Sequence, residues 1–261
     1  MKTGISTSSF FLREECENAI VKICELGAQC AEVFLGTYYE YRPEFAKAHA
    51  HLLSGLEVSS VHALSTNFEP QLFSESRRVR GDGFYWLDQF LRSAQILGAK
   101  KYSFHGYIAQ SGGGADTDKT AAHMQEICDF SARYGVDVCL ENVSWCMYNR
   151  PGIFKELKRR CPSLAAVLDI KQARRSGYPI NMYIEDMSGA ISHVHLSDVD
   201  ENGRICLPGK GVYNYEEIFR RLRGAGFDGA VLIEVYGDNY SEYSELKQSL
   251  DYLNEIIYKL N

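Results

Sequence analysis

Short apolar runs alternate along the chain with longer segments in which apolar residues recur every three or four positions. The apolar runs are typical of buried strands. They end near eight positions, namely Ser6, Phe34, His62, His105, Glu141, Asp169, His195 and Glu234. The longer segments predict amphipathic helices, at 14–26, 84–97, 118–134, 152–160, 178–189, 215–222 and 243–260. Gly27 follows the first of these and is expected to end that helix.

The spacing of these elements predicts the fold class. Eight predicted strands, seven of them followed by a predicted helix, recur at about 33 residues per repeat, the size of a βα unit. Parallel strands joined by helical crossovers give α/β architecture, and eight of them favour one (β/α)8 TIM barrel over a doubly wound sheet. The first strand also lacks the Gly-x-Gly-x-x-Gly motif of dinucleotide-binding sheets. No shift in composition marks a second domain, so we expect a single domain over residues 1–261.

Composition narrows the class of protein further. The chain has 261 residues, of which 45% are hydrophobic and 24% charged, enough to bury a sizeable core. Its formal net charge of −6 weighs against a nucleic-acid partner, because phosphate binding needs a basic face. No apolar run approaches the ~20 residues that span a bilayer, so no membrane partner is expected. Without a signal peptide or a Cys-x-x-Cys pair, we expect a cytoplasmic protein with reduced thiols.

Polar side chains end the last four predicted strands. These are Glu141, Asp169, His195 and Glu234, separated by steps of about one βα unit. The carboxyl ends of barrel strands ring the face where active sites lie, so the four are expected to converge. A single acidic strand end is commonly a helix cap or a loop ion pair, but four in succession favour a shared site.

The chemistry of this quartet predicts a metal. Three carboxylates in one dry pocket are costly without a counter-charge. One divalent metal ion (Mn, Co, Mg or Zn) would offset that cost, and three oxygens with one nitrogen suit such ions. Cys139, two residues before Glu141, is expected to point into the barrel one layer lower, so no thiolate joins the ligands.

Other residues near the strand ends leave two interpretations open. His62 and His105 either hold substrate hydroxyls or a second metal, or they are neutral histidines hydrogen-bonded in the barrel mouth. His193 is expected one layer deeper than His195, as a supporting or core histidine. Four aromatic residues either cover a sugar face or pack locally, namely Phe10, Trp145, Tyr148 and Tyr236. The segment 110–118, with Gly112–Gly114, either cradles a phosphate or is a flexible loop before a helix.

Four runs resemble a known family. They are Val138-Cys-Leu-Glu-Asn142, Val167-Leu-Asp-Ile-Lys171, His193-Val-His-Leu-Ser-Asp198 and Leu232-Ile-Glu-Val-Tyr236. They are similar to the xylose isomerase-like barrels, a superfamily of sugar phosphate isomerases and epimerases that also holds the endonuclease IV type of AP endonuclease. The resemblance covers essentially the whole chain in order, including Leu-Pro-Gly-Lys-Gly at 207–211. It implies a single-metal quartet at Glu141, Asp169, His195 and Glu234, in which both glutamates also act as the acid/base pair.

The chain departs from both branches of that superfamily. His62 and His105 match further zinc ligands of the nuclease branch, but Gln172 stands where that branch has a histidine, and 199–207 contain none. An abasic-site nuclease is therefore not expected. Glu201 stands where the epimerase branch has an arginine. Lys171 either places a cation at a substrate phosphate or carboxylate or pairs with Asp198, and the second interpretation is preferred.

These observations predict a divalent-metal-dependent sugar or sugar phosphate isomerase or epimerase. Glu141 and Glu234 would transfer a proton next to a carbonyl through a metal-stabilised enediolate. The substrate-binding candidates are His62, His105, Lys171 and Trp145. Two alternatives stay open, a metal-dependent lyase of the inosose dehydratase type and a barrel that binds a sugar without turnover. A homo-oligomer is compatible with the sequence.

Overall fold

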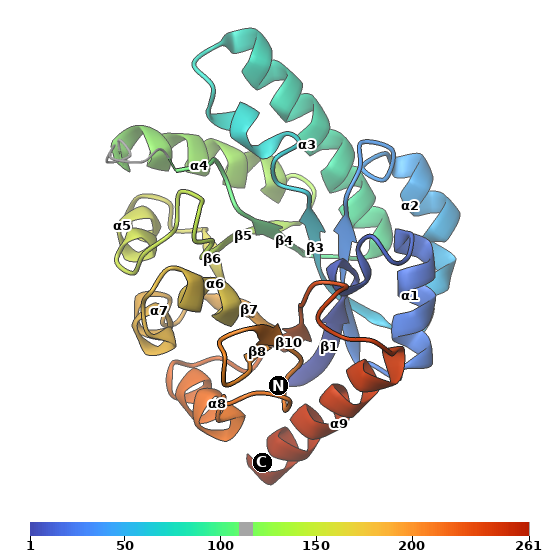
Figure 1. Ribbon diagram of the computed structural model, residues 1–261. Helices are drawn as coiled ribbons and strands as arrows, with labels where there is room; N and C mark the ends of the chain where they lie inside the picture. The colour runs from blue at the N-terminus through green and yellow to red at the C-terminus, as the bar shows by residue number, and fades with distance from the viewer. Residues whose placement is uncertain (110–116, 261) are drawn as a thin grey trace.

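Eight parallel strands close into a barrel that is surrounded by helices (Figure 1). The computed structural model describes residues 1–109 and 117–260. The order around the barrel is β1-β10-β7-β6-β5-β4-β3-β2, which confirms the predicted (β/α)8 class. The barrel strands are β1 (Lys2–Ser6), β2 (Cys30–Leu35), β3 (Glu57–Ala63), β4 (Lys101–Phe104), β5 (Asp137–Glu141), β6 (Ala165–Asp169), β7 (Ile191–Leu196) and β10 (Ala230–Ile233).

Helices cover the outside of the barrel. They are α1 (Cys16–Glu25), α2 (Pro43–His49), α3 (Arg77–Leu97), α4 (Thr117–Ala132), α5 (Ile153–Arg160), α6 (Ile170–Arg175), α7 (Ile180–Asp186), α8 (Tyr215–Gly224) and α9 (Tyr243–Leu260). Short 3-10 helices lie at Thr7–Phe10, Ala50–Leu53 and Glu69–Phe73, and an antiparallel pair joins β8 (Asp198–Val199) to β9 (Ile205–Cys206). Within the described ranges, no helix has both the length and the apolar character that a membrane span requires.

The apolar core lies between the barrel and the helices. Side chains alternate along each strand, so that Val61 and Val194 pack outward in the core while Ser60 and His193 occupy the other face. The interior of such barrels is usually filled by branched apolar residues. Here much of it is polar, with a separate apolar cluster at Cys30, Ala230 and Leu232. The fold therefore brings buried polar side chains to the centre of the barrel.

Local signals explain where the helices begin and end. Gly27 follows α1 with a φ of +72°, and its N–H donates to the Cys24 carbonyl, which confirms the predicted helix end. At the start of α8, the Asn214 side chain accepts a hydrogen bond from the Glu217 N–H at 3.2 Å. Such caps satisfy backbone groups that a helix leaves unpaired at its ends.

The observed helices differ from the predicted ones in three ways. The helix α3 begins at Arg77, seven residues before the predicted start, because its exposed, arginine-rich first turns carry no apolar periodicity. The short helices α2 and α6 were not predicted, since one or two turns give no repeating pattern. The predicted helix at 178–189 is limited to α7. The glycine-rich residues 112–114 lie outside the described residues.

Candidate functional site

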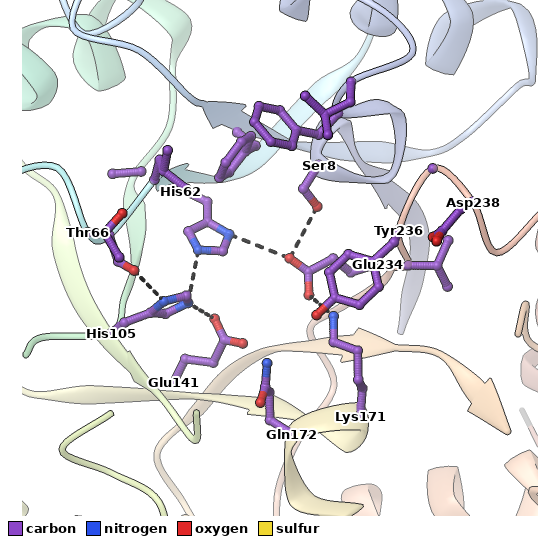
Figure 2. Close-up of a pocket in the computed structure, with 18 of the residues that line it drawn as sticks. Ser8, His62, Thr66, His105, Glu141, Lys171, Gln172, Glu234, Tyr236 and Asp238 are labelled. Carbon is purple, nitrogen blue, oxygen red and sulfur yellow. Dashed lines mark hydrogen bonds and ion pairs between the residues drawn. The ribbon is translucent and has the colours of Figure 1, made fainter. Parts of the chain in front are cut away.

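A pocket of about 830 Å³ opens at the carboxyl ends of the barrel strands (Figure 2). Charged, polar and apolar side chains all contribute to its wall. The residues that line it include Ser8, Phe11, Leu12, Phe34, His62, His105, Glu141, Trp145, Lys171, Gln172, Glu234 and Tyr236. Six of the eight site residues predicted from the sequence are therefore pocket-lining, and Asp169 and His195 are buried beside them.

The barrel brings the predicted quartet together. Glu141 and Asp169 are the last residues of β5 and β6, His195 is next to last in β7, and Glu234 directly follows β10. One ligand atom from each lies within 4.8 Å of those from the other three. All four side chains are buried. The expected convergence at the strand ends is thus observed, whereas a role in binding a metal stays a prediction.

Two buried atoms of the quartet make no hydrogen bond within the described part of the chain. They are Nδ1 of His195 and Oδ2 of Asp169. The other carboxylate oxygen of Asp169 accepts a hydrogen bond from the Gln172 N–H at 2.9 Å, which caps α6 and fixes the side chain. Leaving a buried polar atom without a partner costs about 1–3 kcal/mol. A divalent cation would satisfy both atoms, so this donor set fits a metal ion.

Burial and neighbouring charges set the protonation of these carboxylates. Burial raises the pKa of Asp169 to about 7, against the effect of the Lys171 ammonium. Burial also acts to raise the pKa of Glu234, but His195 and Lys171 together hold it well below its usual range. The pKa of Glu141 is likewise lowered, because His105 and His195 outweigh burial. Glu141 and Glu234 are therefore ionised and able to accept a proton.

Lys171 lies within the quartet and not beside Asp198. Its Nζ is 3.1 Å from Glu234 Oε2 and 3.4 Å from Asp169 Oδ2. The preferred sequence interpretation, a pair with Asp198, is therefore wrong. Asp198 instead accepts hydrogen bonds from the backbone N–H groups of Val199, Gly209 and Tyr213, at 2.8, 3.2 and 3.0 Å. Asp198 thereby fixes the loop after β9, while the first turn of α6 directs Lys171 into the barrel mouth.

His62 and His105 form a hydrogen-bonded pair in the barrel mouth. Their Nε2 atoms are 3.0 Å apart, and Nε2 of His105 is 2.9 Å from Glu141 Oε2. With Glu141 they also form a group that could hold a metal ion. The Trp145 ring stands edge-on to His105, with centroids 6.1 Å apart, and is 41% exposed at the pocket. Both interpretations of the histidines thus stay open.

The four candidate aromatic residues divide into two pairs. Trp145 and Tyr236 line the pocket, whereas Phe10 and Tyr148 are fully buried. The Tyr148 hydroxyl donates to Asp186 Oδ2 at 2.8 Å, so this ring anchors a loop. The packing interpretation is therefore the one that applies to Phe10 and Tyr148.

Sequence reasoning missed two polar residues of the site. Ser8, in the 3-10 helix after β1, donates from Oγ to Glu234 Oε1 at 3.2 Å. Glu32 lies fully buried in the middle of β2, and one of its oxygens is 3.1 Å from Nε2 of His195. The sequence signal for Glu32 is an acidic residue inside an otherwise apolar strand. A charged residue is rarely buried unless it has a polar partner, so its position indicates a buried polar site.

The chain belongs to the family of xylose isomerase-like TIM barrels, whose family model matches residues 20–256. An uncharacterized protein of Methanocaldococcus jannaschii, MJ1311, is 27% identical over 98% of this chain and 91% of its own. The L-ribulose-5-phosphate 3-epimerase UlaE of Salmonella paratyphi A is 25% identical over 71% of this chain and 66% of its own.

Solved structures share the fold. A D-tagatose 3-epimerase-like protein superposes with a TM-score of 0.75 at 23% identity, over 98% of this chain and 100% of its own. The IolI protein, solved with a bound zinc atom, gives a TM-score of 0.75 at 16% identity, over 99% of this chain and 97% of its own. At these identities the likeness concerns the architecture.

Proposed function

We propose that this protein is a divalent-metal-dependent isomerase or epimerase of sugars or sugar phosphates. The observation that carries the proposal is the buried quartet, in which His195 Nδ1 and Asp169 Oδ2 have no hydrogen-bond partner in the described residues and lie beside two ionised glutamates. The epimerase UlaE among the relatives and the zinc-bound IolI protein among the similar structures support the same class.

The residues present fit the chemistry of proton transfer next to a carbonyl. A bound cation would supply Lewis-acid polarisation of the substrate carbonyl. Glu141 and Glu234 reach the same pocket from β5 and from the end of β10 (Figure 2), so one can remove a proton and the other can return it. Transfer between the two faces of one carbon is an epimerisation, and transfer between neighbouring carbons is an isomerisation.

The surroundings of Glu234 keep it in the ionised form that a general base requires. Ser8 donates to its Oε1, and Lys171 lies against its Oε2. Both contacts orient the carboxylate, and the ammonium stabilises its charge. Trp145 and Tyr236 present apolar faces at the pocket mouth, where they would exclude water from the reacting carbons.

Solvent deuterium exchange tests this proposal. The Mn²⁺-loaded protein is incubated in D₂O with a panel of ketoses, ketose phosphates and inosose, and the products are analysed by NMR and mass spectrometry. We expect deuterium at the carbon next to the carbonyl and a new epimer or isomer. Glu141→Gln and Glu234→Gln are each expected to lower the rate by at least about 100-fold, because each removes a proton-transfer group.

A matched control and the other outcomes complete the experiment. Glu57→Gln removes a carboxylate that pairs with Lys2 at the opposite end of the barrel, and it should leave the rate unchanged. Loss of water from the substrate would identify a lyase. Thermal stabilisation by a sugar without deuterium uptake would indicate a binding protein. Either result would overturn the isomerase proposal.

A further inference from the structure

Glu32 is an acidic side chain at the centre of the barrel, beneath the pocket. It is fully buried, and it does not line the pocket. Its oxygens accept hydrogen bonds from Ser6, Ser60 and Ser103, at 2.9, 2.7 and 2.5 Å. These three donors come from β1, β3 and β4. A buried carboxylate is costly, and this one is held by donors from strands on both sides of it.

The same carboxylate reaches His195 on β7. Nε2 of His195 lies 3.1 Å from each of the two Glu32 oxygens. A carboxylate can only accept a hydrogen bond, so this nitrogen carries the proton. When the ring binds a metal it is neutral, and Nδ1 then offers the lone pair. That atom is the one that faces Glu141 and Glu234, at 3.5 and 3.3 Å.

Glu32 also contacts other histidines inside the barrel. Its Oε1 is 3.4 Å from Nδ1 of His62, and its Oε2 is 3.4 Å from Nε2 of His193. His193 is in turn hydrogen-bonded to the Ser103 hydroxyl at 2.7 Å. The carboxylate is thus the common acceptor of a polar layer that spans the barrel, and His195 is the member of that layer that also belongs to the quartet.

From this arrangement we infer that Glu32 is a positioning residue for the metal site. It fixes the ring orientation and the tautomer of His195, so that Nδ1 presents its lone pair to a divalent cation. Carboxylates that bind the distal nitrogen of a metal-ligating histidine make the ligand more basic, and their loss typically weakens metal binding 10–100-fold. The inference rests on the proposed metal site but assigns a role to a residue outside the pocket.

Direct metal titration of Glu32→Gln tests the inference without substrate. The glutamine side chain has the same volume but only one acceptor oxygen, whereas both oxygens of Glu32 accept hydrogen bonds. Its NH₂ group would face hydroxyl and imidazole donors and could not accept from them. We expect the Mn²⁺ dissociation constant to rise by about 10–100-fold. Ser60→Ala is the matched control, since it removes a partner of the same carboxylate without contacting His195, and it should change that constant less than about twofold.

A spectroscopic readout separates positioning from a general loss of packing. In the Zn²⁺-loaded protein, the Nε2 proton of His195, assigned by its absence in His195→Gln, should be far downfield and slow to exchange. In Glu32→Gln it should move upfield and exchange faster. Glu32→Asp, which keeps the charge but withdraws the oxygens, should weaken Mn²⁺ binding to a smaller extent, and it replaces the amide variant if that variant does not fold.

The outcomes distinguish this inference from the proposed activity. Weaker Mn²⁺ binding by Glu32→Gln supports it even where no ketose exchanges deuterium, because the titration contains no substrate. Mn²⁺ binding as tight as in the unaltered protein, an unshifted His195 proton, or a protein that binds no divalent cation would overturn it. Deuterium exchange that survives in Glu32→Gln with unchanged Mn²⁺ affinity would overturn the positioning role alone.

Discussion

Lys171 places a fixed positive charge among the ligands proposed for a cation. Its side chain is 4% exposed, and its ammonium contacts two carboxylates and lies 4.9 Å from the centroid of the Tyr236 ring. Burial alone would lower the pKa of this group, but Asp169 and Glu234 raise it above its usual value, so the ammonium is charged. It therefore repels a bound cation while it stabilises the two carboxylates.

Removal of this charge is the first prediction. At pH 8 we expect Lys171→Met to tighten Mn²⁺ binding by about tenfold, or roughly 1.4 kcal/mol, because a like charge next to the cation is lost. Calorimetric titration measures the change. Lys210→Met removes an exposed lysine in the loop after β9 and serves as the control. Weaker Mn²⁺ binding in Lys171→Met would show that the ammonium supports the site by organising Glu234.

Asp169 carries two functions on its two oxygens, and the second prediction separates them. Oδ1 caps α6 through the Gln172 N–H, whereas Oδ2 is the atom proposed for the metal. Asn caps helices about as well as Asp, so Asp169→Asn should keep the melting temperature of the metal-free protein within a few degrees. Its Mn²⁺ affinity should fall at least about 100-fold, since a neutral amide replaces a ligating carboxylate.

If Asp169→Asn lowered the stability of the metal-free protein as well as the Mn²⁺ affinity, the two functions would not be separate. Asp169→Ala provides the comparison, because it removes both the cap and the ligand. We expect it to lower the stability of the metal-free protein by about 1 kcal/mol relative to Asp169→Asn. Thermal unfolding in the presence of a chelator measures the stability of the metal-free protein, and calorimetric titration measures the Mn²⁺ affinity.

At the scale of single residues, the sequence was informative where chemistry coincides with the end of a strand. Glu141 and Asp169 could be placed because each ends a short apolar run and is followed by a helix. Glu32 could not be placed, since an acidic residue in mid-strand gives no sign of which buried partners it meets. The partner of Lys171 depends on the direction of the first turn of α6, which no local pattern encodes.

At the scale of elements, the N-terminus of α5 is capped by a side chain from the neighbouring helix α7. Gly152 precedes α5 and offers no side-chain cap. Instead Asp186, the last residue of α7, accepts hydrogen bonds from the N–H groups of Phe154 and Lys155, each at 3.3 Å. The same carboxylate also accepts from Tyr148. One side chain therefore fixes the position of α5 against α7 and the loop after β5.

The third prediction concerns this cap. Asp186→Ala should destabilise the protein by about 2 kcal/mol, because three donors lose their acceptor and remain partly buried. For a chain of this size that corresponds to a fall of about 4–8 °C in melting temperature. Asp186→Asn keeps an acceptor and should lose less than half as much. Mn²⁺ affinity should not change in either variant, and a change would show coupling between α5 and the site.

The ends of a helix were predicted more accurately where its apolar residues repeat over more turns. The helix α9 matches its predicted range of 243–260, because five turns of apolar repeat leave little freedom. The start of α3 was missed, since Arg77 and Arg78 face solvent and belong to no apolar stripe. The short pair of β8 and β9 depends on hydrogen bonds between distant loop residues, which sequence periodicity does not report.

At the scale of the whole molecule, the barrel concentrates negative charge at its centre. Glu32, Glu141, Asp169 and Glu234 are all buried, and the charges that face them are Lys171 and the imidazoles of the barrel. Mutual repulsion among buried carboxylates opposes folding unless cations offset it. The stability of the entire barrel, and not only of the pocket, should therefore respond to a divalent cation.

Metal removal is the fourth prediction. A ligand that binds only the folded state stabilises it by about 2.7 kcal/mol at 100 times its dissociation constant. We expect the melting temperature with saturating Mn²⁺ to exceed that with EDTA by about 5–10 °C. The increment should shrink between pH 8 and pH 6, because Asp169, with a pKa of about 7, takes up a proton that competes with the metal. At the same Mn²⁺ concentration, Asp169→Asn should show an increment of at most about 2 °C at either pH. Equal melting temperatures with Mn²⁺ and with EDTA at pH 8 would mean that the buried charges are offset within the chain, chiefly by Lys171, and that the quartet is not a metal site.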